Sequence, residues 1–321
     1  MSFSKEIKRE IMSNALFSKE QALAFLCGLN FSSAHFELNE NSVKNYKITT
    51  DFEELLPYIK MLLEFVYNDK SFEMELLPAF KIGKTPYFDI TLDNETAKKM
   101  LLDIFMVENL GGKLQTTNQI NDKLLDSEDG LKGFVSGVFI GSGTSSIKLD
   151  TNRKTTGYHL EISNSSYELL HEISVALAQF DILAKLTKRK NMYVLYIKDA
   201  EEVSNILALM GASNAVLTLQ NEIVTRQMRN KINRQNNCFV SNFSKTLNAS
   251  FNQLEAIRLI DETYGISSLS QDLQEVALLR LANTEESLEQ LLKLTKTPLT
   301  KSALNHKFQK LIKMASKIKG I

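Results

Sequence analysis

In the first 210 residues, segments with the apolar spacing of a helix alternate with segments that have the apolar spacing of a strand. The helices and strands that this spacing predicts occur twice in the same order. Apolar residues recur about every 3.6 positions in helices and every second position in strands. After a short helix at 3–12, the predicted order is helix, strand, strand, helix, strand, strand, helix, over residues 22–28, 34–38, 45–50, 52–67, 71–77, 87–92 and 95–106. The same order follows over residues 131–140, 144–149, 156–162, 167–179, 182–187, 192–197 and 201–210. Most elements recur about 105 to 111 positions later, so we predict a tandem repeat.

Each copy is predicted to be an α+β unit, in which helices cover one face of an antiparallel sheet. The two copies are expected at about 1–110 and 130–211, within one domain over residues 1–220. Packed together, they would form a longer curved sheet whose other face is free. The polar linker between the copies, 111–130, is expected to be a surface loop.

The opening helix of each copy ends in a string of small residues, FLCGLNFSS at 25–33 and FVSGVFIGSG at 134–143. Small side chains let two helix backbones approach closely, so these helices can pack side by side. This arrangement resembles the LAGLIDADG homing-endonuclease fold, in which two such helices form the interface between pseudo-symmetric halves and the sheets form a saddle over DNA. The resemblance implies a pseudo-symmetric tandem LAGLIDADG-like domain here.

The resemblance also indicates where active endonucleases carry their catalytic acids. In active members an acidic residue near the C-terminal end of each motif helix holds a divalent metal, and those positions fall on Ser33 and Ser142. A serine hydroxyl carries no charge and cannot replace a carboxylate as ligand of a hard cation. We therefore expect a degenerate domain without catalytic residues, metal or other cofactor. The alternative is a divergent metal-dependent endonuclease that uses other carboxylates, such as Glu37 or Asp150.

The C-terminal part of the sequence predicts helices alone. Four are expected, at 247–262, 273–281, 285–294 and 301–318. Thr284 and Thr300 can cap the last two. Two helices separated by a short turn, the second of them basic, match a helix-turn-helix, whose second helix enters the major groove of DNA. We expect an all-α helix-turn-helix domain at 246–321, preceded by an Asn-rich connector at 221–245 that either contacts DNA or forms a hinge whose asparagines cap helices.

Charge separates the two parts of the chain, although the whole is neutral. The sequence holds 38 Lys and Arg against 38 Asp and Glu, but residues 226–321 hold 15 and 8, a net charge of +7, and the first 225 residues therefore carry −7. From Lys296 to the end there are seven lysines and no acid. A basic region attached to an acidic body points to nucleic acid or another anionic surface as partner.

The last predicted helix is the expected contact with double-stranded DNA. On its outer face, Asn and Gln can read adenine and Lys can read guanine. The residues expected to reach base edges are Lys301, Ser302, Asn305, His306 and Gln309. Those expected to neutralise phosphates are Lys296, Lys307, Lys310, Lys313, Lys317 and, in the connector, Arg234. If about five lysines meet phosphates, log affinity should fall with log salt at a slope of roughly −4 to −5. A merely solvated lysine-rich helix is the simpler alternative.

Four strings extend the resemblance to the whole chain: MSFS at 1–4, GYHLEI at 157–162, NRQNNC at 233–238 and KSALNH at 301–306. Together they are similar to the WhiA family of bacterial regulators, which join a degenerate homing-endonuclease-like domain to a helix-turn-helix. The resemblance implies a sequence-specific DNA-binding transcription regulator, linked to sporulation in some bacteria and to cell division or chromosome segregation in others. A nucleic-acid-binding or purely protein-binding scaffold is a further alternative.

The remaining features concern the compartment and the first domain. Cys27 and Cys238 lie far apart without a metal or disulfide spacing, which favours a reducing compartment. No apolar run approaches the ~18 residues that span a bilayer, so we expect a cytoplasmic, nucleoid-associated protein that does not enter a membrane. The net charge of −7 over residues 1–225 argues against broad DNA contact there despite the basic turn at 185–190, and favours a protein partner for this domain.

Overall fold

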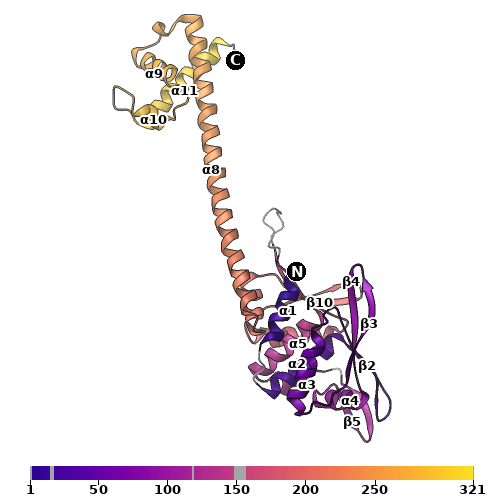
Figure 1. Ribbon diagram of the computed structural model, residues 1–321. Helices are drawn as coiled ribbons and strands as arrows, with labels where there is room; N and C mark the ends of the chain where they lie inside the picture. The colour runs from indigo at the N-terminus through magenta and orange to yellow at the C-terminus, as the bar shows by residue number, and fades with distance from the viewer. Residues whose placement is uncertain (1, 15–17, 118, 148–156, 321) are drawn as a thin grey trace. The chain divides into compact units, whose positions relative to one another are not determined.

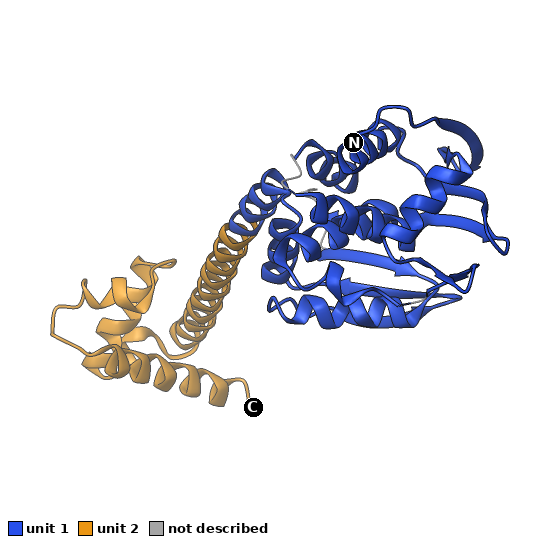
Figure 2. Cartoon of the chain, turned by 90° about the horizontal axis from the view of Figure 1, so that it is seen from below, with its two compact units in different colours: residues 1–225 blue, residues 226–321 orange. Residues whose placement is uncertain are grey.

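The computed structural model describes residues 2–14, 18–117, 119–147 and 157–320, and the chain divides into two compact units, residues 1–225 and 226–321 (Figures 1 and 2). The first unit mixes helices with antiparallel sheets, and the second contains helices only. The predicted fold class is therefore confirmed. Within the residues that are described, no helix is both long enough and apolar enough to cross a bilayer.

Unit 1 begins with helix α1 (Phe3–Ser13) and then contains both predicted copies in the predicted order of elements. The first copy consists of α2 (Lys19–Ser33), β1 (Ala34–Leu38), β2 (Val43–Thr50), α3 (Leu55–Tyr67), β3 (Met74–Ile82), β4 (Thr85–Leu92) and α4 (Asn94–Asp103). The second consists of α5 (Glu128–Ser142), β7 (Gly143–Ile147), β8 (Tyr158–Asn164), α6 (Tyr167–Ala178), β9 (Lys185–Arg189), β10 (Met192–Ile197) and α7 (Ala200–Leu209).

Side-chain caps fix the start of equivalent helices in the two copies. The hydroxyl oxygen of Ser18 accepts a hydrogen bond from the Gln21 backbone N–H, and Ser127 does the same for Gly130 before α5. The carboxylates of Asp93 and Asp199 accept two backbone N–H groups each, before α4 and α7. Because an N-cap satisfies amides that have no partner within the helix, these residues set the helix starts locally.

The two four-stranded sheets have the same topology, with strand orders β1-β2-β4-β3 and β7-β8-β10-β9. Every neighbouring pair is antiparallel. In β8, Leu160, Ile162 and Asn164 are buried and the residues between them are partly exposed. This period of two is that of a sheet covered on one face. The cover in the second copy is α6, which packs against β8, β9 and β10.

The linker between the copies is more ordered than the sequence predicts. In place of a surface loop over 111–130, it contains the end of a hairpin, β5 (Val107–Leu110) with β6 (Lys113–Thr116), then a short 3₁₀ turn, η1 (Asp122–Leu124), and the start of α5. Leu114, Ile120 and Leu124 are buried. The turn of the hairpin is Gly111-Gly112, both with positive φ, a conformation that glycine adopts without a steric penalty. Three apolar residues at irregular spacing give no periodic signal, which is why the pattern missed this segment.

Unit 2 is built from the C-terminal part of α8 (Ser213–Tyr264) and four shorter elements, η2 (Ile266–Ser268), α9 (Gln271–Ala282), α10 (Leu288–Leu292) and α11 (Lys301–Ile318). Its core gathers apolar residues from each long helix, among them Ile257, Ile260, Leu273, Val276, Leu304, Phe308 and Leu311. The small unit therefore has a core of its own.

Two sequence predictions for this region need correction. The connector 221–245 is not a hinge between capped helices, because it lies wholly within α8. No glycine or proline interrupts residues 213–264, so nothing in that stretch stops the helix. The helix predicted over 285–294 is only α10, and its cap is Ser287 in a capping box with Gln290 instead of Thr284.

Candidate nucleic-acid interface

Helix α11 has one buried and one exposed face. Its N-cap is Thr300, as predicted, whose hydroxyl oxygen accepts the Ala303 backbone N–H at 3.2 Å. Buried residues recur at every third or fourth position along the helix: Leu304, Phe308, Leu311 and Ala315. With 3.6 residues per turn, this spacing puts all of them on one side and leaves the opposite side to solvent.

Four of the five predicted base-reading residues share that exposed side. Ser302, Asn305, His306 and Gln309 are all exposed and follow the spacing i, i+3, i+4 and i+7. Lys301 lies apart from them, since its ammonium pairs with the Glu289 carboxylate at 2.5 Å. The pair lowers the pKa of Glu289, chiefly through the hydrogen bond from Lys301. The structure thus places Ser302, Asn305, His306 and Gln309 on one exposed polar surface of α11, and Lys301 lies beside it.

The predicted phosphate contacts divide into three groups. Lys310, Lys313 and Lys317 are exposed and continue the same side of α11 towards its C-terminus. Lys296 is exposed in the segment between α10 and α11, and Arg234 is exposed on α8. Lys307 is turned inward: only 22% of its side chain is exposed and its ammonium lies 3.4 Å from Asp272 of α9. It is therefore less available to a phosphate than the other lysines.

Three acids were missed as partners of this helix by sequence reasoning. Glu289 pairs with Lys301, Asp272 with Lys307, and Glu255 with Lys319 at 2.8 Å. The acids come from α10, α9 and α8. The sequence from Lys296 onward contains no acid, but in the folded unit acids of other helices lie next to three of its lysines. No spacing in the sequence reveals such pairs, because packing of the helices creates them. Among the described residues, Lys296, Lys310, Lys313 and Lys317 form no ion pair.

A buried arginine fixes the elements around α11. Arg280 is 2% exposed, and its guanidinium donates to the side-chain oxygen of Gln253 at 2.9 Å and to the backbone oxygens of Asn283 and Glu286 at 3.1 and 2.7 Å. It also lies over the ring of Phe308 on α11, 5.2 Å from the centroid. Burial lowers the pKa of this guanidinium. The residue therefore connects α8, α9, the segment before α10 and α11 within unit 2.

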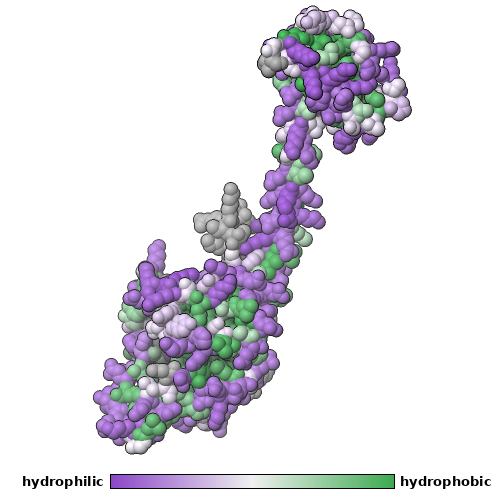
Figure 3. All heavy atoms as spheres, turned by 180° about the vertical axis from the view of Figure 1, so that it is seen from behind, coloured by the Kyte–Doolittle hydropathy of each residue, from purple (hydrophilic) through white to green (hydrophobic). Residues whose placement is uncertain are grey.

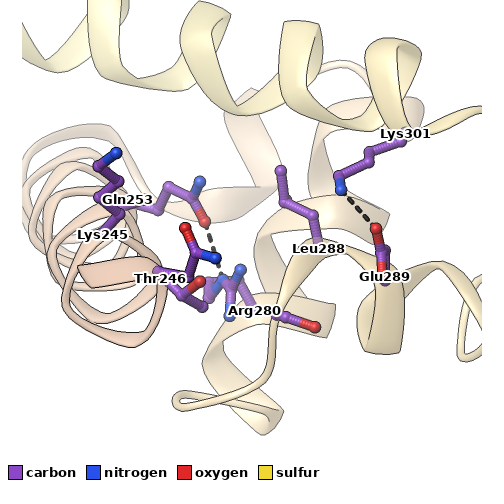
Figure 4. Close-up of a pocket in the computed structure, with 10 residues that line it drawn as sticks. Lys245, Thr246, Gln253, Arg280, Leu288, Glu289 and Lys301 are labelled. Atoms are coloured by element: carbon purple, nitrogen blue, oxygen red, sulfur yellow. Dashed lines mark hydrogen bonds and ion pairs between the residues drawn. The ribbon is translucent and has the colours of Figure 1, made fainter. Parts of the chain in front are cut away.

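A surface pocket of about 540 Å³ lies beside this arginine, and Figure 4 shows the residues that line it. Arg280 and Gln253 meet on one side of the pocket, and the pair Lys301–Glu289 lies on another (Figure 4). Lys245 and Thr246 of α8 complete the labelled polar lining. The pocket thus borders the N-terminus of α11, next to its exposed polar surface.

Ser33 and Ser142, the predicted positions of lost metal-binding acids, lie in unit 1 at the ends of two paired helices. Helices α2 and α5 pack closely: a Cβ atom on Gly28 would lie less than 3.0 Å from the Phe134 carbonyl oxygen, and one on Gly137 equally close to that of Phe25. Ser33 and Ser142 end these helices. Their hydroxyls donate to carbonyl oxygens of their own helices, Leu29 at 2.8 Å and Val138 at 3.5 Å.

Of the two carboxylates named for the alternative endonuclease, the structure describes one. Glu37 is exposed on β1 and accepts a hydrogen bond from the Asn45 side chain at 3.0 Å. Asp150 lies outside the described residues. In the part of unit 1 that is described, Glu37 is thus a surface residue whose carboxylate is hydrogen-bonded to the side-chain amide of Asn45.

Comparisons with known proteins agree for both units. The WhiA LAGLIDADG-like domain model matches residues 131–229, and the WhiA C-terminal HTH domain model matches residues 232–315. Proteins named "Probable cell division protein WhiA" from Clostridium perfringens (strain SM101) and Clostridium acetobutylicum (strain ATCC 824) are 32% and 31% identical over 320 residues, which cover 99% of each chain. The crystal structure of full-length DUF199/WhiA from Thermatoga maritima shares the fold, with a TM-score of 0.60 and 24% identity over 99% of both chains. The chain belongs to the WhiA family of proteins.

Proposed function

We propose that this chain is a sequence-specific transcription regulator that binds double-stranded DNA through α11, acts in cell division or chromosome segregation, and does not cut DNA. The observation that carries the proposal is the exposed side of α11, where Ser302, Asn305, His306 and Gln309 are followed by Lys310, Lys313 and Lys317. The names of the relatives support the cellular process. The domain limits that we propose are 1–220 for the LAGLIDADG-like part and 246–321 for the helix-turn-helix.

The order of residues on this side of the helix fits the docking of a recognition helix. In helix-turn-helix proteins the N-terminal residues of the second helix reach base edges in the major groove. Asn305 and Gln309 each offer an amide that can pair with the N6 and N7 atoms of adenine. The lysines further along the helix would meet phosphates, which fixes the helix in the groove without reading sequence.

Replacing Asn305 by alanine tests the reading role. We expect Asn305→Ala to lower affinity for the preferred duplex about 10-fold to 100-fold, and affinity for random duplex less than about 2-fold, because a bidentate base contact contributes ~1–3 kcal/mol of discrimination. The preferred duplex would be selected from a random library with the full chain, and affinities measured by titration. Asn252→Ala, at an exposed asparagine of α8, is the control and should change neither affinity. A selection without any preferred sequence would contradict the proposal.

Loss of the catalytic acids supports the absence of nuclease activity. The hydroxyls of Ser33 and Ser142 are neutral and donate hydrogen bonds to backbone carbonyl oxygens of their own helices. Phosphodiester hydrolysis at such a site needs carboxylate ligands for the metal. We expect supercoiled DNA to stay intact when it is incubated with the protein and Mg²⁺ or Mn²⁺. Cleavage that disappears in the Glu37→Gln variant would restore the endonuclease alternative.

A further inference from the structure

An exposed apolar stripe runs along the part of α8 that belongs to unit 2. Met228 is 62% exposed, Ile232 54%, Phe239 70% and Phe243 53%. With 3.6 residues per turn, these four positions fall within an arc of about 60° and extend along ~22 Å of the helix. The rings of Phe239 and Phe243 are stacked, with centroids 6.2 Å apart. We name these four residues the α8 stripe.

The α8 stripe is separate from the core of its unit. Further along the same helix, Ile257 and Ile260 are buried among residues of α9 and α11, whereas every residue from 227 to 245 is exposed. On the face of the helix that Figure 3 shows, hydrophilic side chains predominate and hydrophobic ones are few. Single exposed apolar residues are common on protein surfaces, but an aligned row of four, two of them phenylalanine, indicates a binding face.

The charges around the stripe are all of one sign. Between Glu222 and Glu255 the sequence contains five basic residues and no acid: Arg226, Arg229, Lys231, Arg234 and Lys245. By helical spacing, Arg229 and Lys231 lie on opposite sides of the stripe, at the positions that correspond to e and g of a coiled coil. A helix docked on the stripe would therefore have a cation along each edge.

The combination of an apolar stripe with basic flanks fits some binding partners better than others. A second copy of the chain would bring its own five basic residues and no acid to the same stretch of helix, and the like charges of the two copies oppose pairing. A DNA backbone would satisfy the cations but leave Met228, Ile232 and the two phenylalanines without apolar contacts. An amphipathic helix with acidic residues beside its apolar face satisfies both features, by burying the stripe and pairing with both flanks.

We propose that the α8 stripe is the docking site for an acidic amphipathic helix of a partner protein. The helix would be about four turns long, with apolar side chains against the four residues and carboxylates facing Arg229 and Lys231. This site lies outside α11, so the partner can be bound while α11 is on DNA. A DNA-binding chain of this kind would carry its partner to the sites that α11 selects.

A defined peptide tests the proposal with the full-length chain. The probe is a fluorescein-labelled amphipathic helix of about 20 residues, with leucine at positions a and d and glutamate at e and g; its twin carries lysine at e and g. Binding is measured by fluorescence anisotropy. We expect the acidic peptide to bind and the basic twin not to bind. The double variant Phe239→Gln/Phe243→Gln should bind the acidic peptide about 30-fold more weakly, because buried aromatic residues dominate such interfaces, and Arg229→Glu about 10-fold more weakly.

Matched variants make the result specific to the stripe. Phe251→Gln changes an equally exposed phenylalanine of α8, 67% exposed and on a different side of the helix, and should keep wild-type affinity. Lys310→Glu/Lys313→Glu should also keep it, which excludes mere attraction of an acidic peptide to α11. Glutamine favours helix at least as well as phenylalanine, so the circular dichroism of the double variant should be unchanged.

Several results would overturn the proposal. These are no binding of the acidic peptide, equal binding of both peptides, or unchanged affinity in the double phenylalanine variant. A loss of DNA affinity in that variant would identify DNA as the occupant. A wild-type dimer in light scattering that the double variant abolishes would identify a second copy of the chain.

Discussion

Replacing Gly137 by alanine is expected to lower the free energy of unfolding of unit 1 by about 3 kcal/mol. The Cβ atom would lie less than 3.0 Å from both the Phe25 carbonyl oxygen and the Leu29 backbone nitrogen on the facing helix. Backbone atoms cannot rotate away as the end of a side chain can, so α2 and α5 must separate. Because these helices join the two copies, the change would weaken contacts well beyond one residue. Urea unfolding of the full chain, followed by circular dichroism, measures the effect.

The matched controls use two other glycines. Gly28 occupies the equivalent position on α2, and a Cβ there would lie equally close to the Phe134 carbonyl oxygen, so Gly28→Ala should cost about as much as Gly137→Ala. No atom of the described residues lies within 4 Å of a Cβ added to Gly157, and Gly157→Ala should be neutral or stabilising by less than about 1 kcal/mol. If Gly137→Ala unfolds at the same urea concentration as Gly157→Ala, the helices do not pack through their backbones.

Reversing two charges on α11 should lower the affinity for duplex DNA about 100-fold at ~0.1 M salt. Lys310→Glu/Lys313→Glu would remove two of the phosphate contacts that we propose and put two anions in their place. In the wild type, the four lysines without an ion pair in the described chain, Lys296, Lys310, Lys313 and Lys317, predict a slope of log affinity against log salt of about −3 to −4. This slope is shallower than the one that a count of lysines implies. In the double variant the slope should become shallower still, between about −2 and 0.

The control for charge reversal keeps the change in net charge and moves it away from α11. Lys19→Glu/Lys44→Glu alters two exposed lysines of unit 1 and should leave DNA affinity within about 3-fold of wild type. Both variants are titrated with the same duplex at several salt concentrations. An equal loss in both would mean that net charge, and not α11, determines affinity. A wild-type affinity that does not depend on salt would contradict the electrostatic contact altogether.

The resemblance to the endonuclease fold predicted the architecture well because the repeat is encoded locally. Ser18 and Ser127 cap equivalent helices, and Gly28 and Gly137 occupy equivalent positions on them. The bounds of β1 and β10 are the predicted ones. Each of these features depends on residues within a few positions of one another, which periodicity and capping rules can detect. The candidate recognition helix was found in the same way, from Thr300 and the apolar spacing that follows it.

By itself, then, the sequence determined the order of the elements, the duplication and the basic character of the last helix. Tertiary structure alone decided which lysines are available, since Lys301 and Lys307 are paired with acids from α10 and α9. It also decided that the Asn-rich segment is helical and bears an exposed apolar stripe. The physical reason is the sequence separation of the residues involved. Hydrophobic spacing and helix caps depend on residues within one or two turns, whereas ion pairs and exposure depend on which elements pack together.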